Sequence, residues 1–149
     1  MLGFGGLILT AACSSEIGLG VSEVAAPRPT CVAASAAAVA AVEGTLARHD
    51  GVLTSAMIAS VPSADRGFDG YPEYILAAKH VSLFDPSDLA TWALSGRNDF
   101  RPIYPLNDAA RLLTDPTSAG VESDVTEHFH KWDRLAQANL VRECASTAG

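Results

Sequence analysis

The sequence predicts an α+β fold in which an N-terminal and a C-terminal helix pack an antiparallel sheet of three to four strands. Three observations predict it: an alanine-rich stretch at residues 31–49, strand-like runs between short turns, and an amphipathic stretch near the end. With 149 residues, 48% of them hydrophobic, the chain can bury one core but hardly two, because small domains bury too little surface to be stable. We expect residues 31–149 to form a single globular domain.

The first helix is expected at residues 31–49, directly after Thr30, a residue type that favours helix N-caps. Alanine is the best helix former, and this stretch is rich in it. Val39, Val42 and Leu46 are spaced by three and four residues, which places them on one apolar stripe. The pattern predicts a helix that packs by one face.

Three strands are expected at residues 52–61, 74–83 and 89–94, which alternate or are rich in β-branched and aromatic residues. Short segments rich in Pro, Gly and Asp separate them, so neighbouring strands are expected to pair antiparallel as a meander. Residues 101–104 form a fourth candidate. Because two prolines flank or interrupt it, this strand is expected at a sheet edge.

Two helices are expected after the strands. Residues 107–113 form a short one, capped by Asn107 or Asp108 and ended by a Thr-Asp-Pro sequence. A longer one is expected from about residue 123 to 145, where apolar side chains recur at intervals of three and four. These are Val125, Phe129, Trp132, Ala136 and Leu140.

The N-terminus carries the clearest functional signal. Residues 1–12 have no charged side chain, are too short to span a bilayer of about 30 Å and end in small residues, as a signal peptide does. The segment from Leu9 to Cys13 resembles the bacterial lipobox, whose cysteine receives a lipid, although Thr10 stands where leucine is usual and no Lys or Arg precedes the apolar run. Residues 13–30, with two Gly and two Pro, are expected to be a tether. The alternative is that residues 1–12 belong to a cytosolic protein, as a buried strand or a disordered end.

The cysteine count agrees with export. If Cys13 carries lipid, Cys31 and Cys144 remain as an even pair that can form a disulfide in an oxidising compartment. This bond would join the two ends of the domain and contribute about 4–5 kcal/mol by the loop-entropy model. The alternative is two unrelated buried thiols.

Three short motifs follow one another in the domain: Tyr-Ile-Leu-Ala-Ala at residues 74–78, Ala-Thr-Trp-Ala at 90–93 and Leu-Asn-Asp-Ala-Ala-Arg at 106–111, with Cys144 near the end. In this order, after a signal, a cysteine and an alanine-rich helix, they resemble small uncharacterised secreted or lipid-anchored proteins of high-GC Gram-positive (actinobacterial) bacteria. The resemblance covers residues 31–145 loosely. It implies an exported domain and carries no catalytic residue.

Charge and motif content narrow the functional classes. A net charge of −7 and a pI near 4.9 argue against nucleic acid as a partner. No motif of the major hydrolase or nucleotide-binding classes is present, and we expect no cofactor. The His-x-His at residues 128–130 suggests a metal site, but on a helix only Asp124 and His128 share a face. A solvated helix face with ordinary ion pairs is the favoured interpretation.

The remaining polar and aromatic side chains have an ordinary structural interpretation beside a functional one. Loop carboxylates are usually turn formers and caps, although two that converge can bind calcium or act as acid and base; they are Asp65, Asp69, Glu73, Asp85, Asp88, Asp99 and Asp108. The aromatic residues are expected in the core rather than in a ligand groove; they are Tyr71, Tyr74, Trp92, Tyr104 and Trp132.

The sequence therefore favours a non-enzymatic lipoprotein on the outer face of the cell membrane. Its domain would bind an envelope protein or a small ligand through the sheet's outer face and the loop at residues 67–71. The alternative is a small envelope hydrolase or metal-dependent enzyme that uses loop carboxylates with His80 or His128.

Overall fold

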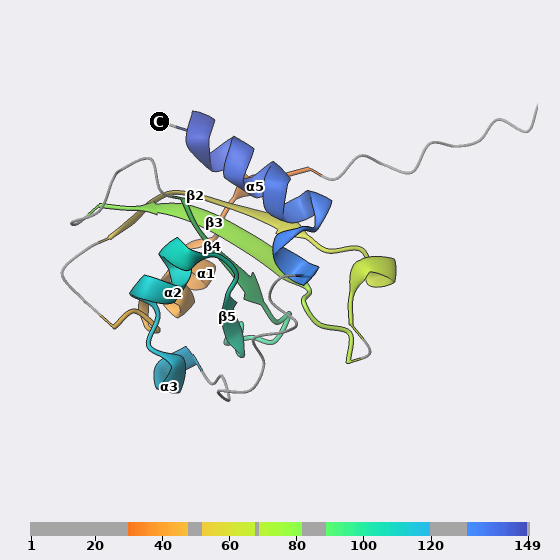
Figure 1. Cartoon of the computed structure of the whole chain (residues 1–149), viewed down its shortest axis with the longest axis horizontal. Helices are drawn as coiled ribbons and strands as arrows, with labels where there is room; N and C mark the ends of the chain where they lie inside the picture. The colour runs from red at the N-terminus through yellow and green to blue at the C-terminus, as the bar shows by residue number, and fades with distance from the viewer. Residues whose placement is uncertain (1–29, 48–51, 68, 82–88, 120–130, 149) are drawn as a thin grey trace, which may run out of the picture.

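The computed structural model describes residues 30–47, 52–67, 69–81, 89–119 and 131–148. Its elements in chain order are β1 (Val32–Ala33), α1 (Ala36–Glu43), β2 (Leu53–Ser60), the 3₁₀ helix η1 (Ser63–Asp65), β3 (Tyr74–His80), β4 (Leu89–Leu94), β5 (Ile103–Pro105), α2 (Asp108–Leu113), α3 (Pro116–Ala119) and α5 (Ala136–Thr147). Figure 1 shows these elements around one sheet.

The sheet is a meander in which sequence neighbours pair antiparallel in the order β1-β2-β3-β4-β5. An α+β fold with an antiparallel sheet is what the sequence predicts. The predicted number of three to four strands is wrong, because the part of the chain that the structure describes contains five. The additional strand is β1, which lies in the stretch expected to begin the first helix.

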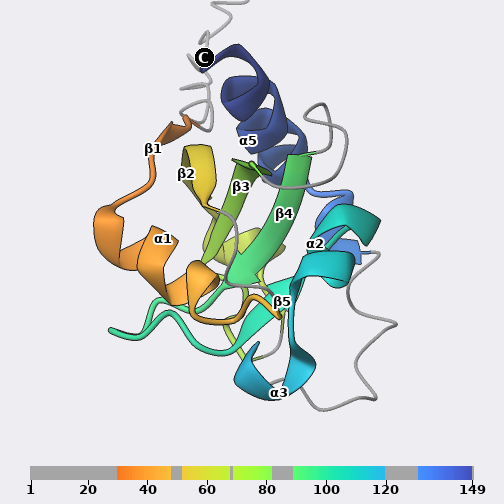
Figure 2. The ribbon, with the colours of Figure 1, turned by 90° about the vertical axis from the view of Figure 1, so that its left-hand side faces the viewer.

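Both faces of the sheet are covered, as β3 shows most clearly. Its four successive residues from Ile75 to Ala78 are fully buried, and successive residues of a strand point to opposite faces. One face shares a hydrophobic cluster with α1 and α2. The other shares a cluster with α5, so that helices lie on both sides of the sheet (Figure 2). The central strands therefore offer no open face, contrary to the expectation that an outer face of the sheet is available for binding.

A β-bulge in β2 explains why its alternation is imperfect in the sequence. The register with β3 shifts between Thr54 and Met57, and Ser55 has a φ of 51°. An extra residue reverses which face the following side chains point to. Leu53 therefore packs in the same cluster as Ile58, although the two residues are an odd number apart.

The first helix is shorter than predicted and starts later. The hydroxyl of Ser35, not that of Thr30, caps α1 by accepting a hydrogen bond from the backbone N–H of Ala38 at 3.2 Å. The residues before it are extended because they pair with β2. Pairing within the sheet thus overrides the helix propensity of the alanines. Part of the predicted end of this helix, at residues 48–49, lies outside the described residues.

The turn from β5 into α2 depends on one side chain. Asn107 caps α2, as predicted, through a hydrogen bond that its Oδ1 accepts from the N–H of Ala110 at 3.1 Å. The same Oδ1 accepts a bond from the N–H of Thr91 at 3.1 Å, and Nδ2 donates to the carbonyl of Leu89 at 2.6 Å. Asn107 therefore takes the place of a strand partner beside the first half of β4, before β5 begins to pair.

The C-terminal helix is interrupted where the sequence predicts one continuous helix. Residues 131–133 are helical, a break follows, and α5 begins at Ala136 with Leu135 at its N-cap. The break changes which side chains face the sheet: Gln137, Ala138, Val141 and Ala145 are buried, while Ala136 is exposed. Within α5, the predicted apolar stripe is therefore wrong at Ala136, whereas Leu140 is partly buried and packs against the cluster on this face. The earlier part of the stripe, at residues 123–130, lies outside the described residues.

Candidate functional site

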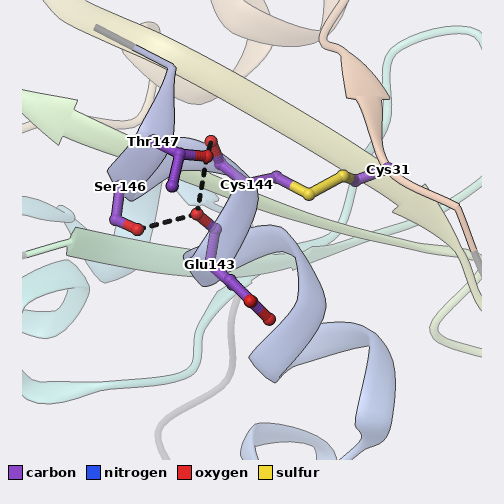
Figure 3. The surroundings of a disulfide bond; sticks show 5 residues. All are labelled: Cys31, Glu143, Cys144, Ser146 and Thr147. Atoms are coloured by element: carbon purple, nitrogen blue, oxygen red, sulfur yellow. Dashed lines mark hydrogen bonds between the residues drawn. A yellow bond between two sulfur atoms is a disulfide. The ribbon is translucent and has the colours of Figure 1, made fainter.

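The structure brings Cys31 and Cys144 together. Their Cα atoms are 6.7 Å apart and their sulfur atoms lie at disulfide distance. Figure 3 shows Cys144 on α5 pointing to Cys31, at the start of β1. Cys31 occupies the strand position whose side chain points to the face covered by α5, one residue before Val32. The cysteine count predicts this pair, but Cys31 lies directly before the edge strand β1 and not at the start of a helix, so the pair joins the edge of the sheet to the last helix.

The candidate metal and acid–base residues are not brought together where the structure describes them. His80 lies at the end of β3, opposite Leu53. Across the described ranges, no three His, Cys, Asp or Glu side chains are arranged to hold a metal ion. Asp124 and His128, the candidate metal pair, lie outside the described residues, as do Asp85 and Asp88.

Several loop carboxylates form turns and caps, as their ordinary interpretation predicts. Oδ1 of Asp69 accepts a hydrogen bond from the N–H of Tyr71, and Oδ1 of Asp99 accepts one from the N–H of Arg101. Asp108 pairs with Arg111 at 3.3 Å on the exposed side of α2. These carboxylates are thus engaged in local structure.

The aromatic side chains belong to the core, as predicted for most of them. Tyr71, Trp92 and Trp132 are buried. Tyr71 packs edge-to-face against Trp132 and Tyr104, and its hydroxyl donates to the carbonyl of Ala93 at 2.6 Å. Burial, together with the nearby Tyr104, raises the pKa of Tyr71 well above its usual value of 10.0. Tyr71 is therefore part of the core rather than an exposed aromatic side chain of the loop at residues 67–71. The other aromatic residue of this loop, Phe68, lies outside the described residues.

An uncharged, exposed surface lies where β1 and α1 are neighbours (Figure 2). Val32 is 59% exposed, one of a few large apolar side chains that are. The outward side of α1 carries only small side chains. We call this surface the uncharged edge and define it by Val32, Ala33, Ala36, Ala37 and Ala40, all exposed.

The sequence contains a signal for the uncharged edge that the alanine pattern obscures. Residues 30–42 include no Asp, Glu, Lys or Arg, in a chain in which 18% of residues are charged. A surface helix normally carries charge on its outward face. The absence of charge on the exposed residues Ala36, Ala37 and Ala40 of α1 therefore distinguishes this surface, although the helix ends at Glu43, whose carboxylate accepts a hydrogen bond from the N–H of Leu53.

Compared with known proteins, the chain matches no family model, no curated protein and no solved structure. Among the helices that the structure describes, none combines the length and apolar character needed to cross a membrane. The function therefore has to be inferred from the disulfide and the uncharged edge.

Proposed function

We propose that this chain is an exported protein of the bacterial cell envelope, anchored through lipid on Cys13, with a non-enzymatic interaction module at residues 31–149. The observation that carries the proposal is the meeting of Cys31 and Cys144. Disulfides persist in oxidising compartments outside the cytosol. Once these two cysteines are paired, Cys13 is the remaining cysteine, and it follows the lipobox-like residues 9–12.

An interaction role is supported by where exposed apolar surface remains. We propose that the N-terminal and C-terminal helices act as covers of the sheet, since Val42 and Val141 belong to the clusters on its two faces. Among the exposed apolar side chains of the described residues, Val32 lies on the uncharged edge, and this edge is the surface that we propose for contact. The carboxylates of Asp69 and Asp99 bind backbone N–H groups in their own turns, which favours a structural role for them over acid–base chemistry.

Export and lipid attachment are tested by mass spectrometry of the protein made in an actinobacterial host. We expect Cys13 at the mature N-terminus with a diacylglyceryl group, and Cys31 and Cys144 resistant to alkylation until a reductant is added. The Cys13→Ala variant is the matched control: it loses the lipid and the membrane fraction and keeps the disulfide. An unprocessed Met1, or immediate alkylation of Cys31 and Cys144, contradicts the proposal.

The contact surface is tested with a photo-crosslinking amino acid placed at Val32 in the membrane-bound protein. Leu112 on α2 is the matched control, because it is also apolar and is 72% exposed. We expect crosslinked products at Val32 and few at Leu112. Equal yields at the two positions, or none at Val32, contradict the assignment of the uncharged edge as the contact surface.

A further inference from the structure

Among the described residues, no strand pairs with β1 on its outer side. The N–H of Ala34 donates to the carbonyl of Ala56 at 2.9 Å, so the backbone groups of Ala34 point toward β2. In an antiparallel pair, alternate residues direct their N–H and C=O to the same neighbour. The N–H and C=O of Val32 therefore also point toward β2, and the N–H and C=O of Ala33 point away from the sheet. Because β1 is the first strand in the sheet order, no strand among the described residues lies on that side.

Ala33 presents one donor and one acceptor on a strand edge, which is a template for another strand. When an antiparallel partner pairs with such a residue, the two exchange both hydrogen bonds. A second copy of Ala33, related by a two-fold axis, supplies this same donor and acceptor. The edge is thus complementary to itself, as a two-fold interface requires.

The charge distribution favours a second copy as the occupant of the uncharged edge. Two molecules that each carry a net charge of −7 repel one another in most relative orientations. Residues 30–42 carry no charge, so contact at this surface places no like charges opposite each other. Val32 and Ala34 share the face of the sheet on which α1 lies, so the small side chains of Ala36, Ala37 and Ala40 also border this contact.

We propose that two copies of this chain associate through the uncharged edge, with Ala33 of one copy paired to Ala33 of the other and the two sheets joined edge to edge. The inference names the partner of the interaction module and in that respect rests on the function proposed above. The disulfide supports the interface, because Cys31 ties β1 to α5 one residue before the paired strand. This tie holds the edge strand in place for pairing.

The test is sedimentation equilibrium of the mature exported protein, in a detergent that is matched in density to the solvent. We expect a monomer–dimer equilibrium. Ala33→Pro removes the outward N–H and keeps the bonds to β2, and we expect it to raise the dimer Kd by about tenfold or more. Ala37→Glu, on the exposed side of α1, adds a charge to the uncharged edge and is expected to raise the Kd in the same direction. Leu112→Glu, an equivalent change on α2, should leave the Kd within about twofold.

Two controls make each outcome decisive. Thermal unfolding and resistance to alkylation verify that Ala33→Pro remains folded with its disulfide intact. If Ala33→Pro does not fold, the effect of Ala37→Glu on the dimer Kd tests the interface instead. A monomer at all concentrations, a dimer unaffected by Ala37→Glu, or equal weakening by Leu112→Glu overturns the proposal. Failure of lipid attachment with an intact dimer overturns the anchor alone, and a lipid-anchored monomer overturns this interface alone.

Discussion

Asn107 offers the sharpest test of how this fold is held together, because one side chain replaces a strand and caps a helix. In Asn107→Ala, the N–H groups of Ala110 and Thr91 both lose their acceptor, and both residues are fully buried. Loss of an N-cap costs about 1 kcal/mol, and an unsatisfied buried donor costs about 1–3 kcal/mol. The carbonyl of Leu89 also loses its donor but is only half-buried. We expect a total loss of about 3 kcal/mol in the free energy of unfolding.

Asn107→Asp separates the two functions of this side chain. The carboxylate keeps both hydrogen bonds that Oδ1 accepts, but its second oxygen replaces the donor Nδ2 and faces the carbonyl oxygen of Leu89, which it repels. Because Leu89 is only half-buried and water can reach it, we expect a loss of about 1–2 kcal/mol, smaller than that of Asn107→Ala. Asp108→Ala is the neighbouring control: the Asp108 side chain is 93% exposed, and its removal should leave the stability close to wild type. Urea denaturation followed by tryptophan fluorescence measures all three. The reasoning is refuted if Asn107→Ala changes the free energy of unfolding by less than about 1 kcal/mol, or if the Asp and Ala variants are equal.

Three further perturbations have definite expected outcomes. Replacing Cys31 or Cys144 by Ala should lower the free energy of unfolding by about 4–5 kcal/mol, because the bond closes a loop of 113 positions. Urea denaturation should give the same loss for either single variant and for the double variant. Unequal losses would contradict the pairing. Trp92→Phe and Thr114→Val each remove the 2.9 Å hydrogen bond from the indole N–H to the threonine hydroxyl. A double-mutant cycle should therefore give a coupling free energy of about 1 kcal/mol. If the two losses in the free energy of unfolding are additive, this hydrogen bond contributes nothing. Burial raises the pKa of Tyr71 above its usual 10.0, so this side chain should not affect stability below pH 10. As the pH rises from 10 toward the folded-state pKa, the free energy of unfolding should fall, because only the unfolded state releases the proton. Urea denaturation should show a smaller alkaline decline for Tyr71→Phe, and an identical decline in both proteins would rule out Tyr71 as its cause.

The central part of the fold is predictable from sequence because its signals are local. β4 occupies the predicted residues 89–94, and α2 starts after the predicted cap Asn107. Turn residues, alternation and a capping side chain each act within a few positions of the chain. The pairing of Cys31 with Cys144 is long-range, but the cysteine count leaves a single pair once Cys13 is assigned to lipid.

The errors arise where tertiary contacts decide between local alternatives. Alanines at residues 33–34 favour helix, yet pairing with β2 makes them extended, and Ser35 rather than Thr30 then begins the helix. The bulge at Ser55 depends on fitting side chains to both faces of the sheet. The break before α5 shifts the buried face to Gln137 and Val141. A regular helical period extended from the preceding residues does not predict such a shift.

The candidate surface is harder to predict than the fold. The uncharged run at residues 30–42 is visible in the sequence, but its alanines are equally typical of a helix buried on every side. Its position at a sheet edge depends on β1, which is formed by pairing with β2. A surface of this kind is identified by charge and exposure together, and exposure is known only from the folded chain.

The sulfur link between the first strand and the last helix also determines how the molecule transmits tension. A pull applied between the chain that precedes Cys31 and the C-terminal end enters at Cys31 and leaves at Cys144, so a covalent path carries the load and the 112 residues between them are bypassed. The hydrogen-bonded strands need not resist such a load. A peptide bond cleaved in any loop between the two cysteines would likewise leave both fragments attached to one particle until the link is reduced. Under the cell-surface anchor that we propose, this link would keep the domain in one piece against both proteolysis and mechanical load.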